Sequence, residues 1–476
     1  MPTLRVPYLR VPCFVGDGEV RFAATRHKLG GAGEAAVLRA VFRSEATTED
    51  LAALLVAQAL EPDLESANLR LQAIFKDQNG VLGEVEITVP EKVDVILIEQ
   101  GYGGVYVHTV ELMKQLRKRW SCLLLSPVPP LFEPAPMPDV LSLEGLRKTD
   151  PDLPYFAWVQ ILRTIVQKVA CRLLLIMHRS QSLYLFDLLR LRPTVIYCDG
   201  FYDGAFRRVQ DFHLDESPER RDEVLAELHY LIANGPSRFH GMSATPSVNV
   251  KLLMAGSYSL TAAVENWCWG KEQHANFAGE FPGLRDRIRM MLPFTNPELF
   301  ERAAVHRQRK VLFTTTMHNI DQKGYPELAK AMELLPRVEA RVVVRQPHLL
   351  PKVPAKVTRR MVTGPVSKPE MIGLYHTLWL NCRVSRQESS PLSILESMVC
   401  EMPQIISTTV AEQIPILEDG ATGFVIDPDD NERLRWALTT LLGDDRLRDR
   451  MGREARRRAI ALSFDRRVHE FERLLG

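Results

Sequence analysis

Two successive series of short apolar runs, each followed by a turn and a helical segment, constrain the fold of this chain most strongly. The first series opens at residues 93–98, passes through a glycine-bearing turn and continues with helical periodicity over 107–116. Strand, glycine turn and helix form the opening unit of a doubly wound sheet. Runs of the same kind follow at 122–125, 173–177 and 194–197. Such continuous apolar runs are typical of parallel strands covered on both faces.

The second series begins at Lys310. Its apolar runs and the helical segments between them alternate regularly. The runs are 310–314, 341–344, 378–384 and 404–407, and the helical segments are 326–335, 368–376 and 391–400. We therefore predict an α/β protein with two Rossmann-like, doubly wound domains that face a cleft. Pro293, Asn296 and Pro297 interrupt regular structure between the two series and indicate the boundary.

The predicted organisation has four parts. Residues 1–90 form an accessory N-terminal region, in which 49–60 read as a helix and 81–89 as a strand. Residues 91–300 and 301–455 are the two Rossmann-like domains, and 456–476 form a C-terminal helix. A length of 476 residues suits this division, because one hydrophobic core seldom serves so long a chain.

The charge balance argues against a nucleic-acid binder. The chain carries 60 basic and 59 acidic residues, whereas nucleic-acid binding normally requires a clear basic excess. Lys114, Arg117, Lys118 and Arg119 form one local basic cluster. It reads either as the solvated end of a helix, which we favour, or as a patch for a membrane surface.

The cysteines and the apolar runs point to a cytoplasmic protein. The seven cysteines are scattered, and none forms a C-x-x-C pair, so neither a zinc site nor a disulfide framework is supported. The N-terminus lacks the pattern of a secretory signal, and no apolar run approaches the ~20 residues that span a bilayer. We expect a soluble protein, or one at most peripheral to the inner face of the membrane.

The most informative segment runs from Glu388 to Glu396. Ser390 suits the N-cap of a helix and Pro391 its first position, so the sequence predicts that a helix begins there. The free backbone N–H groups of the segment Ser390 to Ser393, those of Ser390, Leu392 and Ser393, would then provide a site for a phosphate. Glu388 and Glu396 could reach the same ligand, and carboxylates are suited to paired sugar hydroxyls.

This segment and its surroundings resemble the retaining glycosyltransferases of family 4, the glycosyl transferases group 1. That family carries an E-x7-E motif followed by a helix and a strand. Residues 418–430, which read EDGATGFVIDPDD, resemble the DG-x-TG turn of the family. The resemblance covers 310–476 well and 93–300 loosely, and it implies the two-domain GT-B fold. It also implies that 91–300 form the acceptor domain and 301–455 the nucleotide-sugar donor domain, and that the C-terminal helix, 456–476, packs back on the first domain.

The resemblance also implies roles for the donor site. Glu396 would bind the ribose hydroxyls, Glu388 the transferred sugar, and the backbone of 390–393 the diphosphate. The family's R-x4-K-G element maps to His318, Lys323 and Gly324, so a histidine stands where the family has an arginine. Because histidine is only partly protonated near neutrality, diphosphate binding would depend on pH. The alternative is that the glutamates are ordinary surface residues and His318 an ordinary loop residue.

The first domain gives weaker signals. Gly103 and Gly104 resemble the family's glycine-rich turn, and His178 follows an apolar run as a histidine of the family does. Asp199 stands where the family has a second histidine. We take His178 and Asp199 as catalytic candidates, and a structural turn and a core histidine remain the alternatives for the glycines and His178.

The function that the resemblance implies is a retaining hexosyltransferase. Its donor would be a UDP- or GDP-sugar, and its acceptor a hydroxyl group on a glycan, a lipid-linked glycan, a protein or a small molecule. No cofactor and no metal are expected, since no D-x-D metal motif is obvious. The alternative is a glycosyltransferase-fold binding or scaffold subunit with weakened catalysis, because two residues of the family pattern are replaced.

Overall fold

Two parallel sheets form the centre of the fold. The computed structural model describes residues 1–10, 13–15, 19–22, 26–28, 32–44, 46–77, 82–99, 103–128, 139–198, 222, 225–226, 259–300, 307–315, 321–344, 347–386, 388 and 390–476. The chain divides into two compact units. One comprises 1–109, 116–267 and 280–287, and the other 110–115, 268–279 and 288–476.

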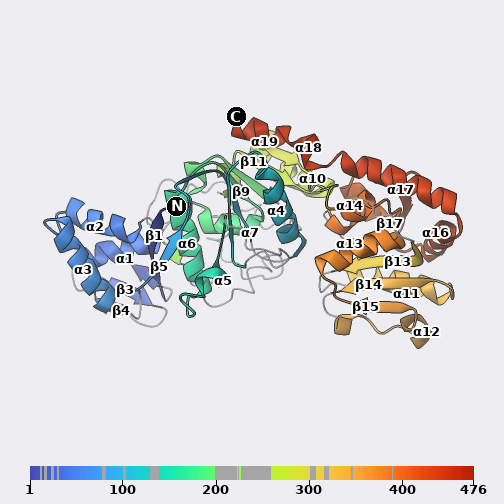
Figure 1. The fold of residues 1–476 in the computed structure, drawn as a ribbon, viewed down its shortest axis with the longest axis horizontal. Coiled ribbons are helices and arrows are strands. Elements are labelled where there is room, and N and C mark those ends of the chain that lie inside the picture. The colour runs from blue at the N-terminus through green and yellow to red at the C-terminus, as the bar shows by residue number, and fades with distance from the viewer. Residues whose placement is uncertain are drawn as a thin grey trace. The chain divides into compact units, whose positions relative to one another are not determined.

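The first sheet has the strand order β12-β11-β10-β9-β6-β7-β8, and Figure 1 labels β9 and β11 of this sheet. Its strands are β6 (Lys92–Ile98), β7 (Cys122–Ser126), β8 (Val140–Ser142), β9 (Ala170–Ile176), β10 (Thr194–Cys198), β11 (Glu265–Cys268) and β12 (Ile288–Met290). The pairs from β8 through β7, β6 and β9 to β10 are all parallel. The four strands predicted for this domain are therefore confirmed. The three that were missed, β8, β11 and β12, are short.

Several helices and 3-10 turns connect or follow the strands of the first sheet. They are α4 (Gly103–Leu116), α5 (Leu143–Leu146), α6 (Tyr155–Lys168), α7 (Arg179–Ser182), α10 (Lys271–Glu280) and the 3-10 turns η1 (Leu183–Leu185), η2 (Leu189–Leu191) and η6 (Pro282–Arg287). Helix α4 begins at Gly103, earlier than its periodicity indicated. Gly103 and Gly104 thus open the helix, where we had expected them in the turn before it.

The N-terminal region combines two antiparallel sheets, the two-stranded β1-β5 and the three-stranded β2-β3-β4, with helices. Its elements are β1 (Thr3–Leu9), β2 (Cys13–Val15), β3 (Glu19–Phe22), β4 (Arg26–Lys28), α1 (Ala32–Arg43), α2 (Thr48–Ala57), α3 (Leu64–Asp77) and β5 (Leu82–Thr88). Strand β1 pairs with β5 along its whole length. The helix and strand predicted here are α2 and β5. Helix α2 ends before residue 60 because Ala59 adopts a left-handed conformation with φ of 54°.

Helix α6 forms hydrogen bonds with this N-terminal region. The amide of Leu9 donates to Gln160 Oε1 at 2.9 Å, and Thr164 Oγ1 donates to the carbonyl of Ser44 at 3.2 Å. Ser44 follows α1 with φ of 57°, so the polar face of α6 satisfies a carbonyl that the end of α1 leaves open. The accessory region is thus tied by hydrogen bonds to a helix of the first Rossmann-like domain.

The second sheet has the order β15-β14-β13-β16-β17-β18, and every pair in it is parallel. Its strands are β13 (Gln308–Thr315), β14 (Glu339–Val344), β15 (Met361–Gly364), β16 (Leu378–Arg383), β17 (Gln404–Ser407) and β18 (Gly423–Ile426). In chain order this reads 3-2-1-4-5-6, the order of doubly wound dinucleotide-binding sheets. Two parallel sheets of separate chain series were predicted, and that prediction is confirmed.

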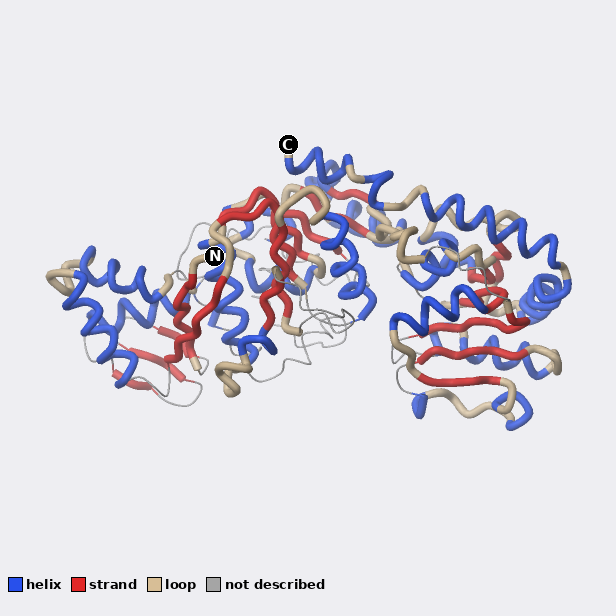
Figure 2. Tube along the Cα trace, in the orientation of Figure 1, coloured by secondary structure: helices blue, strands red, loops and turns tan. Residues whose placement is uncertain are grey.

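The helices of this half are α11 (Tyr325–Glu333), α12 (Ala355–Thr358), α13 (Lys368–Thr377), α14 (Leu392–Val399), α15 (Thr408–Gln413), α16 (Asn431–Gly443), α17 (Asp445–Ile460), α18 (Phe464–Arg467) and α19 (His469–Leu475), with the 3-10 turns η7 (Asp321–Lys323) and η8 (Pro347–Leu349). Figure 2 shows strands and helices alternating here. Along β13, Val311 and Phe313 pack with α11 and α16, whereas Leu312 packs with α13 and α14. Neighbouring side chains of one strand therefore enter different cores on the two faces of the sheet.

The C-terminal segment contacts residues that precede β13. Phe294 packs against Phe464 and Phe471, with ring centroids 5.9 Å and 5.5 Å away. Thr295 and Ser463 form a parallel bridge. The packing of residues 456–476 on the first domain stays a prediction, as do the four domain boundaries.

Candidate functional site

The site lies at the carboxyl ends of β13 and β16. These strands are neighbours, and the chain continues from them toward opposite edges of the sheet. At such a switch point the loops after two parallel strands part from each other, and doubly wound proteins bind their ligands there. Lys323 follows β13, and Glu388 follows β16. Both were predicted as donor-site residues.

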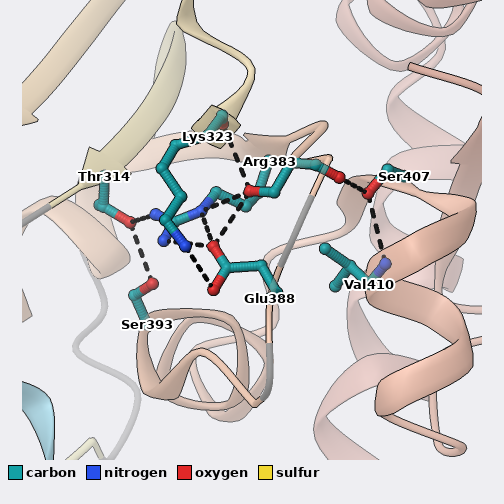
Figure 3. A network of polar contacts seen from close by, with 8 residues as sticks. Thr314, Lys323, Arg383, Glu388, Ser393, Ser407 and Val410 are labelled. Atoms are coloured by element: carbon teal, nitrogen blue, oxygen red, sulfur yellow. Dashed lines mark hydrogen bonds and ion pairs between the residues drawn. The ribbon is translucent and has the colours of Figure 1, made fainter. Parts of the chain in front are cut away.

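Glu388 is the centre of a polar network (Figure 3). Its side chain is 8% exposed, and Lys323 Nζ lies 2.9 Å from its Oε2. Its Oε1 accepts hydrogen bonds from Arg383 Nε at 3.0 Å and Arg383 Nη2 at 2.9 Å. Ser385 Oγ donates to the same oxygen at 3.0 Å. One buried carboxylate thus holds two cations, one on each oxygen.

The network shifts the ionisation of its members. Burial tends to raise the pKa of Glu388, but Arg383 and Lys323 outweigh it and hold the pKa of that carboxyl below its usual value. Burial lowers the pKa of Lys323, the Glu388 carboxylate opposes this shift, and the Arg383 charge adds to it. Among the described residues of this cluster, two positive groups stand against one negative group, and this excess of positive charge favours an anionic ligand.

Backbone contacts fix Lys323 beside Glu388. Ser385 Oγ donates to the carbonyl of Lys323 at 3.3 Å, and the amide of Arg386 donates to the carbonyl of Gln322 at 2.7 Å. Gly324 has φ of 84°, and a Cβ there would lie 2.6 Å from the carbonyl oxygen of Val384. The glycine is therefore required twice, for its left-handed backbone and for its close approach to the loop after β16.

The start of α14 lies beside the same cluster. Thr314 Oγ1 accepts from Arg383 Nη1 at 3.0 Å and donates to Ser393 Oγ, also at 3.0 Å. A hydrogen-bonded chain therefore joins the buried guanidinium to the first turn of α14. The amide groups that open a helix carry partial positive charge, so they add to the two cations.

The helix begins one residue later than the sequence indicated. Pro391, not Ser390, is the N-cap of α14, and no side chain caps the helix. The carbonyl of Pro391 accepts from the amide of Ile394 at 3.0 Å, which places Pro391 just outside the helix. The hydroxyl of Ser390 is buried and, among the described residues, has no hydrogen-bond partner. An anion at this turn would supply the missing acceptor.

Glu396 has partners of its own. Its Oε1 lies 3.1 Å from Lys368 Nζ, and its Oε2 accepts from Tyr375 Oη at 2.8 Å. Tyr375 is buried, and that burial together with the Glu396 charge raises its pKa, so the phenol stays a donor. The side chain of Glu396 is 20% exposed, more than that of Glu388. The carboxylate is therefore oriented by protein groups and still reaches solvent.

The remaining candidates come from other segments of the chain. His318 and Asp199 lie outside the described residues. His178 follows β9 and is half-buried, and Gly103 and Gly104 open α4. Among the residues that the structure describes, no cluster of side chains could hold a metal ion and no helix could span a membrane.

Three residues of the site were not predicted. Tyr375 and Lys368 lie on α13, where nothing in the sequence distinguishes them from a core residue and a surface residue. Arg383 did leave a signal, because it is the one charged residue within the apolar run 378–384. A charge in a buried strand needs a partner, and here the partner is Glu388.

A comparison with known protein families finds a match within the second half of the chain. Residues 358–458 match the family "Glycosyl transferases group 1". No protein of curated function matches the chain in sequence.

Solved structures resemble the whole fold at low identity. Sucrose-phosphate synthase from Thermosynechococcus elongatus has a TM-score of 0.55 and 16% identity, over 81% of this chain and 98% of that one. The Anabaena protein HepE, solved with UDP and glucose, has a TM-score of 0.53 and 14% identity, over 80% and 99%. WaaG, a glycosyltransferase of lipopolysaccharide biosynthesis, has a TM-score of 0.50 and 15% identity, over 77% and 95%. These likenesses establish the GT-B fold.

Proposed function

We propose that the protein is a glycosyltransferase that moves a hexose from a UDP- or GDP-sugar to a hydroxyl-bearing acceptor with retention of configuration. The match of residues 358–458 to the family "Glycosyl transferases group 1" and the GT-B fold support this proposal. The observation that carries the proposal is the excess of positive charge at the switch point. Lys323, Arg383 and the start of α14 meet there around the single carboxylate of Glu388. A diphosphate would supply the missing negative charge.

Each polar group near this point has a role in the proposal. Lys323 and the backbone amides of Ser390, Leu392 and Ser393 hold the diphosphate, and Gly324 lets the loop that carries Lys323 approach β16. Glu396 accepts the ribose hydroxyls while Tyr375 orients it. Glu388 faces the sugar. That HepE was solved with UDP and glucose supports a nucleotide sugar as the class of donor.

The chemistry of retention would come from the donor itself. In the proposed reaction the acceptor hydroxyl attacks on the face from which the diphosphate leaves, and a phosphate oxygen takes its proton. His178 and Asp199 are the candidates that would orient the acceptor. The proposed site needs neither a metal nor a cofactor, since cations and helix amides neutralise the leaving group.

Titration with UDP and GDP tests the donor site. Glu396→Ala should weaken binding of the nucleotide by more than about tenfold, because two charge-assisted hydrogen bonds to the ribose are lost. Glu432→Ala is the matched control, since that carboxylate is 90% exposed on α16. Equal affinity of Glu396→Ala and the parent protein for both nucleotides would contradict the assignment.

A binding or scaffold subunit is the second candidate. It is favoured by the full engagement of Glu388, whose two oxygens already have partners. Incubation with a panel of UDP- and GDP-sugars separates the two candidates. An enzyme releases free UDP or GDP over time, whereas a binding subunit shows affinity without release.

A further inference from the structure

The two oxygens of Glu388 are held in different ways. Oε1 accepts from two N–H groups of Arg383 and from the hydroxyl of Ser385. For Oε2 the one recorded partner among the described residues is the amine of Lys323, at 2.9 Å. One oxygen is thus fixed by three donors, whereas the other depends on a single flexible side chain.

The two cations also differ in how firmly each is held. The guanidinium of Arg383 is planar and 7% exposed, and its Nη1 is bound to Thr314 on β13. It is therefore tied to two strands, and through Thr314 to Ser393 in α14. Lys323 carries its charge at the end of four methylene groups, and an ammonium can exchange one oxygen for another by rotation. Arg383 is the fixed cation and Lys323 the exchangeable one.

We propose that Arg383 is a positioning residue that holds Glu388 in place while Lys323 passes from this carboxylate to the diphosphate of the donor. This proposal rests on the proposed function and deepens it. Once Lys323 has moved, Oε2 of Glu388 is open to hydroxyls of the transferred sugar. Diphosphate binding thus prepares the sugar subsite, and in the absence of donor Glu388 occupies the cation that the phosphate needs.

The charges explain why Arg383 is required for this exchange. A buried carboxylate that loses its only cation is strongly destabilised. With Arg383 present, Glu388 keeps one cation when Lys323 leaves. Without Arg383, Lys323 would be the sole cation for Glu388 and would be retained against the incoming anion.

A double-mutant cycle tests the proposal, with inorganic pyrophosphate as the probe and calorimetry as the measurement. Glu388→Gln should bind pyrophosphate about tenfold more tightly than the parent, because Lys323 loses its competing carboxylate. Arg383→Met should bind about tenfold more weakly. The double variant should return to the affinity of Glu388→Gln, because Arg383 acts only through Glu388. Such non-additivity is the signature of residues that act through one another.

A purely structural role, or a direct contact of Arg383 with phosphate, gives a different result. In either case the two substitutions would act independently, so the double variant would bind about tenfold more weakly than Glu388→Gln, and that outcome overturns the proposal. Arg386→Met is the matched control, since Arg386 lies three residues away and pairs with Glu327 and Asp429. Its pyrophosphate affinity should equal that of the parent.

The cycle remains decisive if Arg383→Met does not fold. The double variant has no uncompensated buried carboxylate, so it is compared directly with Glu388→Gln. Affinities within about twofold support the proposal, and a tenfold loss overturns it.

UDP and GDP are titrated alongside pyrophosphate. A parent that binds pyrophosphate with the expected cycle but neither nucleotide contradicts the nucleotide donor and leaves the role of Arg383 intact. A parent that binds none of the three overturns both.

Discussion

The ionisation of the site depends mainly on the amine of Lys323. Burial lowers the pKa of its amine, while the carboxylate of Glu388 works in the opposite direction and the guanidinium of Arg383 adds to the lowering. A bound diphosphate would bring more negative charge next to the amine and raise its pKa again. Anion binding and protonation of Lys323 are therefore linked.

This linkage predicts a fall in anion affinity at alkaline pH. Below the lowered pKa the amine is charged in the free protein, so Lys323 adds no pH dependence. As the pH rises through that lowered pKa, the affinity for UDP and pyrophosphate should decline, and binding should take up a proton. Calorimetry in buffers of different ionisation enthalpy measures both effects. Lys323→Met should abolish the alkaline decline, and a decline that persists in this variant would contradict the prediction.

A contribution from His318 would appear in a different pH range. If His318 assists the diphosphate, affinity should also fall between about pH 6 and 8, the ordinary range of histidine. His318→Arg should then flatten this part of the profile and tighten binding. A parent profile that is flat over this range, and unchanged in the variant, would remove His318 from the site.

At the scale of elements, the loops after β13 and β16 act as one unit. The amide of Arg386 and the hydroxyl of Ser385 bind carbonyls of the first loop, and Gly324 lies against the backbone of Val384. These contacts fix the position of the Lys323 backbone, from which its side chain extends. The ion pair between Lys323 and Glu388 is thus a consequence of how closely the two loops approach.

Gly324→Ala should separate these loops. The new Cβ would overlap the Val384 carbonyl, and the left-handed backbone at φ of 84° disfavours alanine, so we expect a loss of about 1–3 kcal/mol in the free energy of unfolding. Affinity for pyrophosphate should fall with it. Gly373→Ala in helix α13 is the control, because its Cβ would meet no atom within 4 Å, and it should leave stability unchanged or raise it. Chemical denaturation of both variants measures the difference, and equal stabilities would contradict the argument.

At the scale of the molecule, the described parts of residues 1–90 are bound to the first Rossmann-like domain through buried polar contacts. Helix α6 supplies the polar groups that bind this region, and its Arg163 forms a buried ion pair with Asp187, with side chains 1% and 9% exposed. Arg163 Nη2 also donates to the carbonyl of Arg43 at the end of α1. One buried arginine therefore joins the N-terminal helices to the domain.

Arg163→Met should destabilise the protein strongly. Removing one partner of a buried pair leaves an uncompensated charge on Asp187, which is worth about 3–5 kcal/mol. Arg5→Met is the control, because Arg5 pairs with Glu49 at the surface, with side chains 41% and 55% exposed. A surface pair contributes at most about 1 kcal/mol. Denaturant unfolding compares the two variants, and similar losses in both would show that α6 does not anchor the region through Arg163.

Local sequence patterns determined the two α/β series. The apolar runs at 93–98 and 404–407 are strands because a parallel strand covered on both faces needs little besides apolar side chains. Short strands such as β8 and β18 offer an apolar run of only two or three residues, which is too short to indicate a strand by itself. They form because a neighbouring strand offers hydrogen-bonding groups. The order of the strands likewise cannot be predicted from any single segment.

At the site, too, the sequence determined some features and the tertiary structure others. The sequence alone identified Glu388, Glu396 and Lys323 as donor-site candidates, because a turn, a helix start and two carboxylates stand close together in the chain or match a known motif. Only the tertiary structure placed Lys323 and Arg383 on opposite oxygens of Glu388. The physical reason is that this contact depends on the adjacency of β13 and β16, two strands far apart in sequence that pair only when the whole sheet forms.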